Sequence, residues 1–135
     1  MGTDDPGLKW TAERVVDEGD RSGFFSDIEM MEKASDPRLV DFHLEALTGN
    51  EYFVLLREDL GEASVLFERY TFEDVPTHRI IEFIALLERG DVSLSFSRFK
   101  WWLSVEVSIP EGKWAIGRRF RKDLSEWEES IIKRH

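Results

Sequence analysis

The stretch DVSLSFSRFKWWLSVEVSIPEGKWAIGRRF, residues 91–120, decides the fold expected for this chain. Apolar and polar residues alternate along most of it, and this period of two predicts β-strands with one buried face. A turn at Ser97-Arg98 would pair residues 96, 94 and 92 with residues 99, 101 and 103, so that every pair is apolar. A bulge within one long strand is the alternative, because Ser-Arg is a poor pair for a tight hairpin turn. Pro110-Glu111-Gly112 predicts the next turn, which completes a three-strand meander.

A second hairpin is expected from residues 52–57 and 64–72, which flank a short connection containing Gly61. Ser26 and Glu29 have the spacing of a helix capping box, with Phe25 and Met30 as its hydrophobic staple. Helices are expected over residues 8–17, 27–34, from Pro37 to Gly49, from residue 74 or 77 to Gly90, and from Asp123 onward. The sequence therefore predicts a single α+β domain over residues 1–135. Its antiparallel sheet of about five strands packs with N-terminal, central and C-terminal helices.

Composition excludes several classes of chemistry. The chain has no cysteine, so disulfides, thiolate nucleophiles and cysteine-bound zinc are excluded. No apolar run reaches the roughly 20 residues of a membrane span. The first ten residues, MGTDDPGLKW, are acidic and lack the apolar segment of a secretory signal. A cytoplasmic, soluble protein is expected.

The net charge of −10 is unevenly distributed along the chain. Residues 1–62 carry 16 acids and 6 bases, whereas residues 63–135 carry 12 of each. An acidic half of this kind repels nucleic acid and anionic membranes, and it favours a basic partner or cations. The alternative is that these acids lie on solvated helix faces and only maintain solubility.

The segment EGDRSGFFSDIE, residues 18–29, resembles the calcium loop of an EF-hand. The resemblance implies five ligands: Glu18, Asp20, Ser22, the Phe24 carbonyl and Glu29. The segment departs from that pattern in its first position, which is Glu rather than Asp, and no second loop of this kind exists to pair with it. Ser26 and Glu29 are also explained by helix capping. No cofactor or metal is therefore favoured, and calcium is kept as an alternative.

The run RRFRK, residues 118–122, places bases beside aromatic residues, a combination typical of surfaces that hold single-stranded nucleic acid. The alternation buries the neighbouring aromatics Trp114 and Phe120, so these bases are interpreted as a solvated strand edge that pairs with acidic helices. No nucleic acid is expected. The sequence contains no recognised catalytic motif. A small enzyme using His43 or His78 with a carboxylate is a further alternative, and no catalytic residue is predicted.

Trp102 is the only large apolar residue on the polar side of the strand expected over residues 99–109. If helices cover the sheet on one side only, Trp102 is exposed and can anchor a partner. The function expected is a non-enzymatic protein-binding module, an immunity- or antitoxin-type inhibitor that blocks a basic toxin or effector. The alternatives are a secretion-chaperone-like binding protein and a calcium-binding regulatory domain, and a homodimer stays open. The predicted partner contacts are Asp17, Glu18, Asp20, Glu58, Asp59, Glu62 and Trp102.

Overall fold

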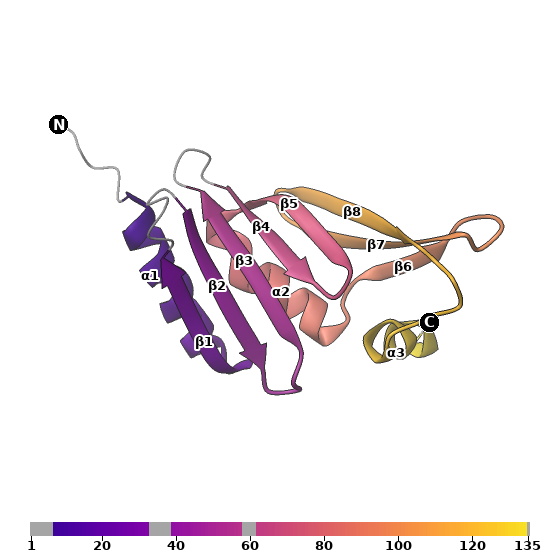
Figure 1. Cartoon of the computed structure of the whole chain (residues 1–135), viewed down its shortest axis with the longest axis horizontal. Helices are drawn as coiled ribbons and strands as arrows, with labels where there is room; N and C mark the ends of the chain where they lie inside the picture. The colour runs from indigo at the N-terminus through magenta and orange to yellow at the C-terminus, as the bar shows by residue number, and fades with distance from the viewer. Residues whose placement is uncertain (1–6, 33–38, 58–61, 135) are drawn as a thin grey trace. The chain divides into compact units, whose positions relative to one another are not determined.

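The computed structural model describes residues 7–32, 39–57 and 62–134 (Figure 1). Within these residues the chain forms eight strands in two antiparallel sheets and three α-helices, so the predicted α+β class is confirmed. The chain divides into two compact units, Met1–Glu82 and Phe83–His135, called unit 1 and unit 2 below. The single domain over residues 1–135 stays a prediction.

Unit 1 holds a five-stranded sheet in which each strand pairs with its neighbour in the chain. The strands are β1 (Phe25–Glu32), β2 (Leu39–Ala46), β3 (Glu51–Arg57), β4 (Glu62–Phe67) and β5 (Tyr70–Pro76). Alternate residues on β2 to β5 are buried, which gives the sheet an apolar inner face. Helix α1 (Gly7–Ser22) covers this face through Ala12 and Val15 and lies behind the sheet in Figure 1. The opposite, outer face is the one seen by the viewer.

Two predicted helices of unit 1 are wrong, because residues 25–32 and 39–46 are strands. On β2, Val40, Phe42, Leu44 and Ala46 are all buried, with Asp41, His43 and Glu45 between them on the other face. The apolar residues of this segment also fit the spacing of a helix face, which is why a helix was predicted. The residues that are buried nevertheless alternate strictly, as in a strand. Ser26 and Glu29 therefore cap no helix, and Gly49 lies in the β2–β3 turn with a φ of 94°. Residues 33–38 lie outside the described ranges.

The predicted β3–β4 hairpin is confirmed, with Val54 opposite Val65. The single strand expected over residues 64–72 is instead two strands, because the chain turns at Glu68-Arg69 and Glu68 takes a left-handed φ of 55°. Both edge strands of the sheet are irregular. The β1–β2 register shifts between Phe25 and Asp27, and the β4–β5 register shifts between Ala63 and Val65. Such bulges bend a strand locally and interrupt its row of hydrogen-bonding groups.

Unit 2 holds the predicted meander, formed by β6 (Ser93–Phe96), β7 (Trp102–Ile109) and β8 (Gly112–Arg119). The β7–β8 turn lies at Pro110-Glu111 as expected. The predicted register of the first hairpin is wrong, since Phe96 faces Leu103 and not Phe99. Ser97 accounts for the wider loop. Its amide donates to the Trp102 carbonyl at 2.8 Å, and its Oγ accepts from the amides of residues 101 and 102 at 3.1 Å each.

The two expected helices of the C-terminal half are present as α2 (Ile80–Arg89), which follows a 3₁₀ turn at Thr77–Arg79 and precedes Gly90, and α3 (Glu126–Arg134). Within unit 2, the Phe83 ring meets the Trp114 ring edge to face at 6.0 Å. Trp127 Nε1 donates to the Leu87 carbonyl at 2.7 Å, which ties α3 to α2. Helix α3 begins at Glu126, three residues after the predicted start at Asp123, because Ser125 and Glu128 form its capping box.

Arg118 lies at the buried end of β8 and organises the chain that follows it. Its side chain is 7% exposed, and it continues the inward-facing positions of residues 114 and 116. Nε and Nη2 donate to the two carboxylate oxygens of Glu128 at 2.9 and 2.7 Å. Nη1 donates to Asp123 Oδ1 and to the Arg119 carbonyl, and Nη2 also donates to the Asp123 carbonyl. All five guanidinium N–H groups are therefore bound, and the loop leading to α3 is closed around them.

Removing Arg118 leaves Glu128, 2% exposed, as a buried charge without its main partner. We expect Arg118→Ala to lower the free energy of unfolding of unit 2 by about 3–5 kcal/mol. Arg119→Ala, at the exposed neighbouring position, is the matched control and should change it by less than about 0.5 kcal/mol. Urea unfolding followed by tryptophan fluorescence measures this, since four of the five tryptophans lie in residues 83–135. Equal losses in the two variants would contradict the assignment.

Candidate functional site

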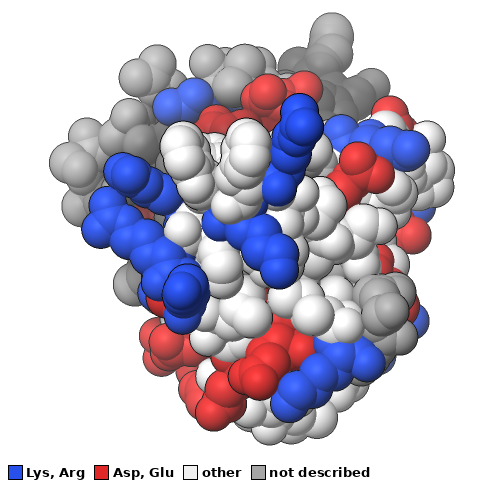
Figure 2. Space-filling model, turned by 90° about the vertical axis from the view of Figure 1, so that its right-hand side faces the viewer, with Lys and Arg blue, Asp and Glu red and all other residues white. Residues whose placement is uncertain are grey.

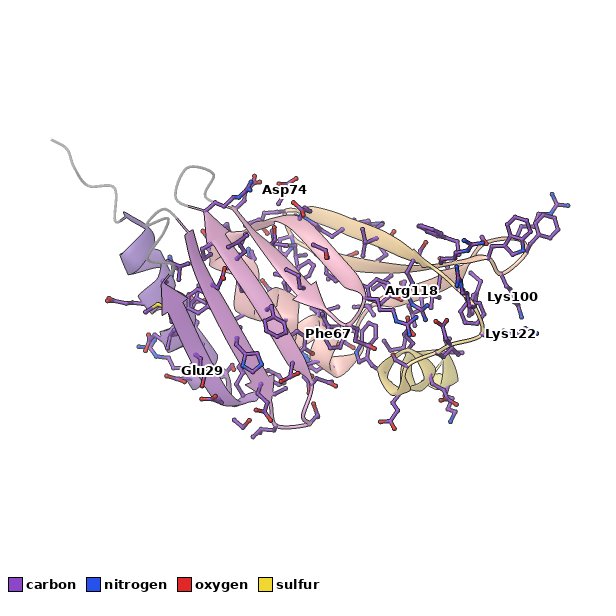
Figure 3. The ribbon with its side chains drawn as sticks, in the orientation of Figure 1. Glu29, Phe67, Asp74, Lys100, Arg118 and Lys122 are labelled. Atoms are coloured by element: carbon purple, nitrogen blue, oxygen red, sulfur yellow. The ribbon has the colours of Figure 1, made fainter. Side chains whose placement is uncertain are left out.

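The outer face of the five-stranded sheet carries a row of three carboxylates. Asp27 on β1 lies opposite Glu45 on β2, and Glu45 lies opposite Glu51 on β3. Like charges directly opposite one another destabilise a sheet. Glu29, labelled in Figure 3, lies on the same face opposite His43. Within the described ranges, no Lys or Arg forms an ion pair with Asp27, Glu29 or Glu45.

An apolar centre adjoins this row. Phe53 on β3 and Leu66 on β4 lie opposite each other, and their side chains are 46% and 38% exposed. The His43 ring is 4.9 Å from the Phe53 ring, and its Nε2 lies 3.1 Å from Glu51 Oε1. The outer face thus combines exposed apolar side chains with an acidic border. We call Asp27, Glu29, Glu45, Glu51, Phe53 and Leu66 the acidic face.

The structure does not gather the predicted acidic contacts on this surface. Asp17 and Glu18 lie on α1, the helix of the inner face, where they pair with Arg21 and Arg14 at 2.9 Å each. Asp20 is exposed near the end of the same helix. Glu58 and Asp59 lie outside the described residues. The acidic face was missed because its segments β1 and β2 were predicted to be helices.

Glu62, the remaining predicted acid, lies at the start of β4 and interacts with Asp74 of β5, which is labelled in Figure 3. The hydrogen bond that the protonated Glu62 carboxyl donates to Asp74, together with burial and the charge of Asp74, raises the pKa of Glu62 above its ordinary value of 4.5. Asp74 takes a left-handed φ of 60° in the β5 bulge. The two carboxylates border a hollow of about 10 Å³, lined also by Arg57 and Glu73, which has room for about one water molecule.

Asp74→Asn should return the pKa of Glu62 toward its ordinary value, because a neutral amide accepts the Glu62 hydrogen bond more weakly than a carboxylate and carries no charge, while asparagine tolerates the left-handed φ. Between the ordinary and the raised pKa the folded state holds more protons, so stability falls as pH rises through that interval. The stability of Asp74→Asn should not fall in this interval. Its melting temperature should therefore exceed that of the parent at pH 7, by a difference that shrinks toward pH 3.

NMR titration of the Glu62 carboxyl group and thermal melting at both pH values measure the effect. Asp20→Asn removes the same charge from α1 and should leave the Glu62 titration unchanged. An unaltered Glu62 pKa in Asp74→Asn would show that the two carboxylates do not interact.

The structure of residues 18–29 differs from the helix–loop–helix of an EF-hand. Glu18, Asp20 and Ser22 lie in the last turns of α1, but Glu29 lies on strand β1 and not at the start of a second helix. The Phe24 carbonyl accepts a hydrogen bond from the Leu47 amide at 2.9 Å. Across the part of the chain that the structure describes, no group of three or more His, Asp or Glu side chains is placed to hold a metal ion.

Trp102, whose exposure the sequence left open, lies on β7 and is 48% exposed. Its indole ring lies over Gly117 of β8, where a Cβ would come within 2.6 Å of the ring carbon Cε2. The prediction for residues 118–122 as one solvated edge is wrong for Arg118, which is buried, whereas Arg119, Arg121 and Lys122 are exposed. Phe99 and Trp101 were expected on the buried side of a strand, yet they lie in the β6–β7 loop at 70% and 73% exposure.

Comparison of the chain with family models, curated proteins and solved structures finds no match. None of the described helices is both long enough and apolar enough to cross a membrane.

Proposed function

We propose that this chain is a non-enzymatic protein-binding module that inhibits a basic protein, in the manner of an immunity protein or antitoxin, and that the acidic face binds the partner. The row Asp27–Glu45–Glu51 is the observation that carries the proposal. Three carboxylates at one register repel one another in the free protein. A basic partner relieves this repulsion when it binds. The free energy that the repulsion costs the free sheet then favours complex formation.

The apolar centre supports the same surface. Phe53 and Leu66 offer exposed area that a partner can bury, and their acidic border excludes partners of like charge. Unit 1 carries 20 acids and 8 bases in its sequence, a net charge of −12. A field of that sign accelerates the encounter with a basic protein. The acids of α1 contribute to this long-range field, while Asp17 and Glu18 already have cationic partners.

A stability measurement tests the repulsion without a partner. Glu45→Gln removes the central charge of the row and both of its repulsions, so it should raise the free energy of unfolding by about 0.2–1 kcal/mol. Glu29→Gln is the matched control, because Glu29 faces His43 and not a carboxylate. Its effect should be smaller than that of Glu45→Gln. A loss of stability in Glu45→Gln would argue against a repulsive row.

The function itself is tested by capture from the native cell lysate with three immobilised forms of the chain. The parent chain and an Asp17→Asn/Asp20→Asn variant of α1 should retain the same basic protein at low salt. A Glu45→Gln/Glu51→Gln/Phe53→Ser variant of the acidic face should lose it. With that protein purified, the parent chain at equimolar concentration should abolish its activity. Its association rate should fall with salt more steeply than that of the face variant.

Retention of the partner by the face variant, or its loss by the α1 variant, would assign binding to another surface. A captured partner whose activity survives an excess of the chain would instead favour the chaperone alternative.

A further inference from the structure

The loop between β6 and β7 carries large aromatic side chains into solvent. Phe99 and Trp101 are the most exposed aromatic residues within the described ranges, and Trp102 follows at the start of β7. In Figure 1 the loop that joins β6 and β7 projects beyond the end of β8. The loop is nevertheless fixed by hydrogen bonds, since the Lys100 amide donates to the Ser97 carbonyl at 2.9 Å. An ordered loop that exposes two aromatic rings, beside a third that is half exposed on β7, marks an interaction site.

Cations surround these rings. Arg98 and Lys100 lie in the loop itself, and the Phe120 amide donates to the Trp101 carbonyl at 2.8 Å, which holds the segment after β8 against the hairpin. Arg119 at the end of β8 lies opposite Trp102, and Arg121 and Lys122 follow in that segment, so five exposed cations lie on the hairpin and the chain held against it. We call these eight residues the aromatic tip. Figure 2 shows Lys and Arg side chains beside uncharged ones on this side of the molecule, and Figure 3 labels Lys100 and Lys122.

Among the described residues, the cations of the aromatic tip have no acidic partners. No carboxylate of the described residues forms an ion pair with Arg98, Lys100, Arg119, Arg121 or Lys122. The nearest acid in sequence, Asp123, is held by Arg118 at 3.0 Å. Their charge is therefore available to an anionic ligand.

Two of the lysines occupy positions that suit glycine better. Lys100 and Lys122 have left-handed φ angles of 58° and 60°, which cost a side chain with a Cβ more than they cost glycine. Lysine at both positions places positive charge at the tip at the expense of backbone strain. Strain of this kind concentrates at functional sites.

We propose that the aromatic tip binds the surface of an anionic lipid bilayer, with its rings among the headgroups and its cations against their charges. Tryptophan favours the membrane interface, and long cationic side chains extend from there to the headgroups. Each cation close to an anionic surface strengthens binding about fivefold. A hairpin loop can enter such a deformable layer without a preformed groove. Single-stranded nucleic acid fits less well, because the Phe99 and Trp101 rings are inclined by 44° and form no common stacking surface.

The inference is independent of the proposed function and departs from the expectation of no membrane partner. That expectation rested on the acidity of residues 1–62 and on the absence of an apolar run long enough to span a membrane. Unit 2 carries 10 bases and 8 acids, so the acidity that repels an anionic bilayer belongs to the sequence of unit 1. The local charge of the aromatic tip governs contact within a Debye length of the surface.

Flotation with vesicles tests the proposal on the full chain. We expect binding to phosphatidylcholine vesicles containing 30% phosphatidylserine at low salt, little binding to pure phosphatidylcholine, and a weaker interaction at high salt. Phe99→Ser/Trp101→Ser should reduce the partition constant at least tenfold. Lys100→Gly should reduce the partition constant about fivefold. Its melting temperature should be no lower than that of the parent, because glycine relieves the left-handed φ.

Two controls match these changes elsewhere on the surface. Leu47→Ser removes a strongly exposed apolar side chain from the β2–β3 turn, and Lys113→Gln removes an exposed cation from the start of β8. Both should bind as the parent does.

Four results would overturn the proposal: no flotation at low salt, equal binding to uncharged vesicles, unchanged binding by both tip variants, or displacement from vesicles by a 20-residue oligothymidine. The last would assign the aromatic tip to nucleic acid. Self-association that the tip variants abolish in the absence of lipid would assign it to a second copy of the chain.

Discussion

Arg118 is a cation at an inward-facing strand position, and every one of its N–H groups is bound. The two carboxylates and two carbonyls that bind it come from residues 119–128, so β8, the following loop and the start of α3 share one centre. Helix α3 then brings Trp127 to the Leu87 carbonyl. The same centre fixes the loop after β8 that carries the exposed Arg121 and Lys122. A buried ion pair need not add stability over an apolar substitute, but removing one member is costly, and here its geometry selects one path for the chain.

The sequence predicted best where a pattern had a single interpretation. The β7–β8 hairpin, the β3–β4 hairpin and the helix before Gly90 follow from period-two or period-3.6 burial with clear turn residues, whereas the register of the β6–β7 hairpin, whose turn residues were ambiguous, was predicted wrongly. Residues 25–46 failed because Leu39, Val40, Leu44 and Leu47 suit a helix face, while burial follows 40, 42, 44 and 46. The acidic face could not be found once those segments were taken as helices. Arg118 could have been found, because it continues the inward positions of Trp114 and Ile116.

The two surfaces share a physical property, although they differ in charge and lie on different units. The row of Asp27, Glu45 and Glu51 retains mutual repulsion, and the aromatic tip retains exposed rings and left-handed lysines. Each feature lowers the stability of the free protein. Local conflicts of this kind are expected at functional sites and are rare elsewhere in a well-packed chain. This common property, and not the overall net charge, distinguishes these positions from the paired surface residues of α1.

The irregular edges of the five-stranded sheet bear on how another chain can approach it. Regular edge strands offer open backbone groups to any extended peptide, which leads to strand addition and eventually to cross-β aggregates. Here β1 carries a bulge near Phe25 and exposed acids, while β5 carries a bulge with Asp74 and ends at Pro76, which has no amide hydrogen. Both edges of the sheet therefore resist the addition of further strands. The partner proposed for unit 1 would therefore recognise side chains on the outer face of the sheet, and recognition by side chains confers a selectivity that backbone pairing lacks.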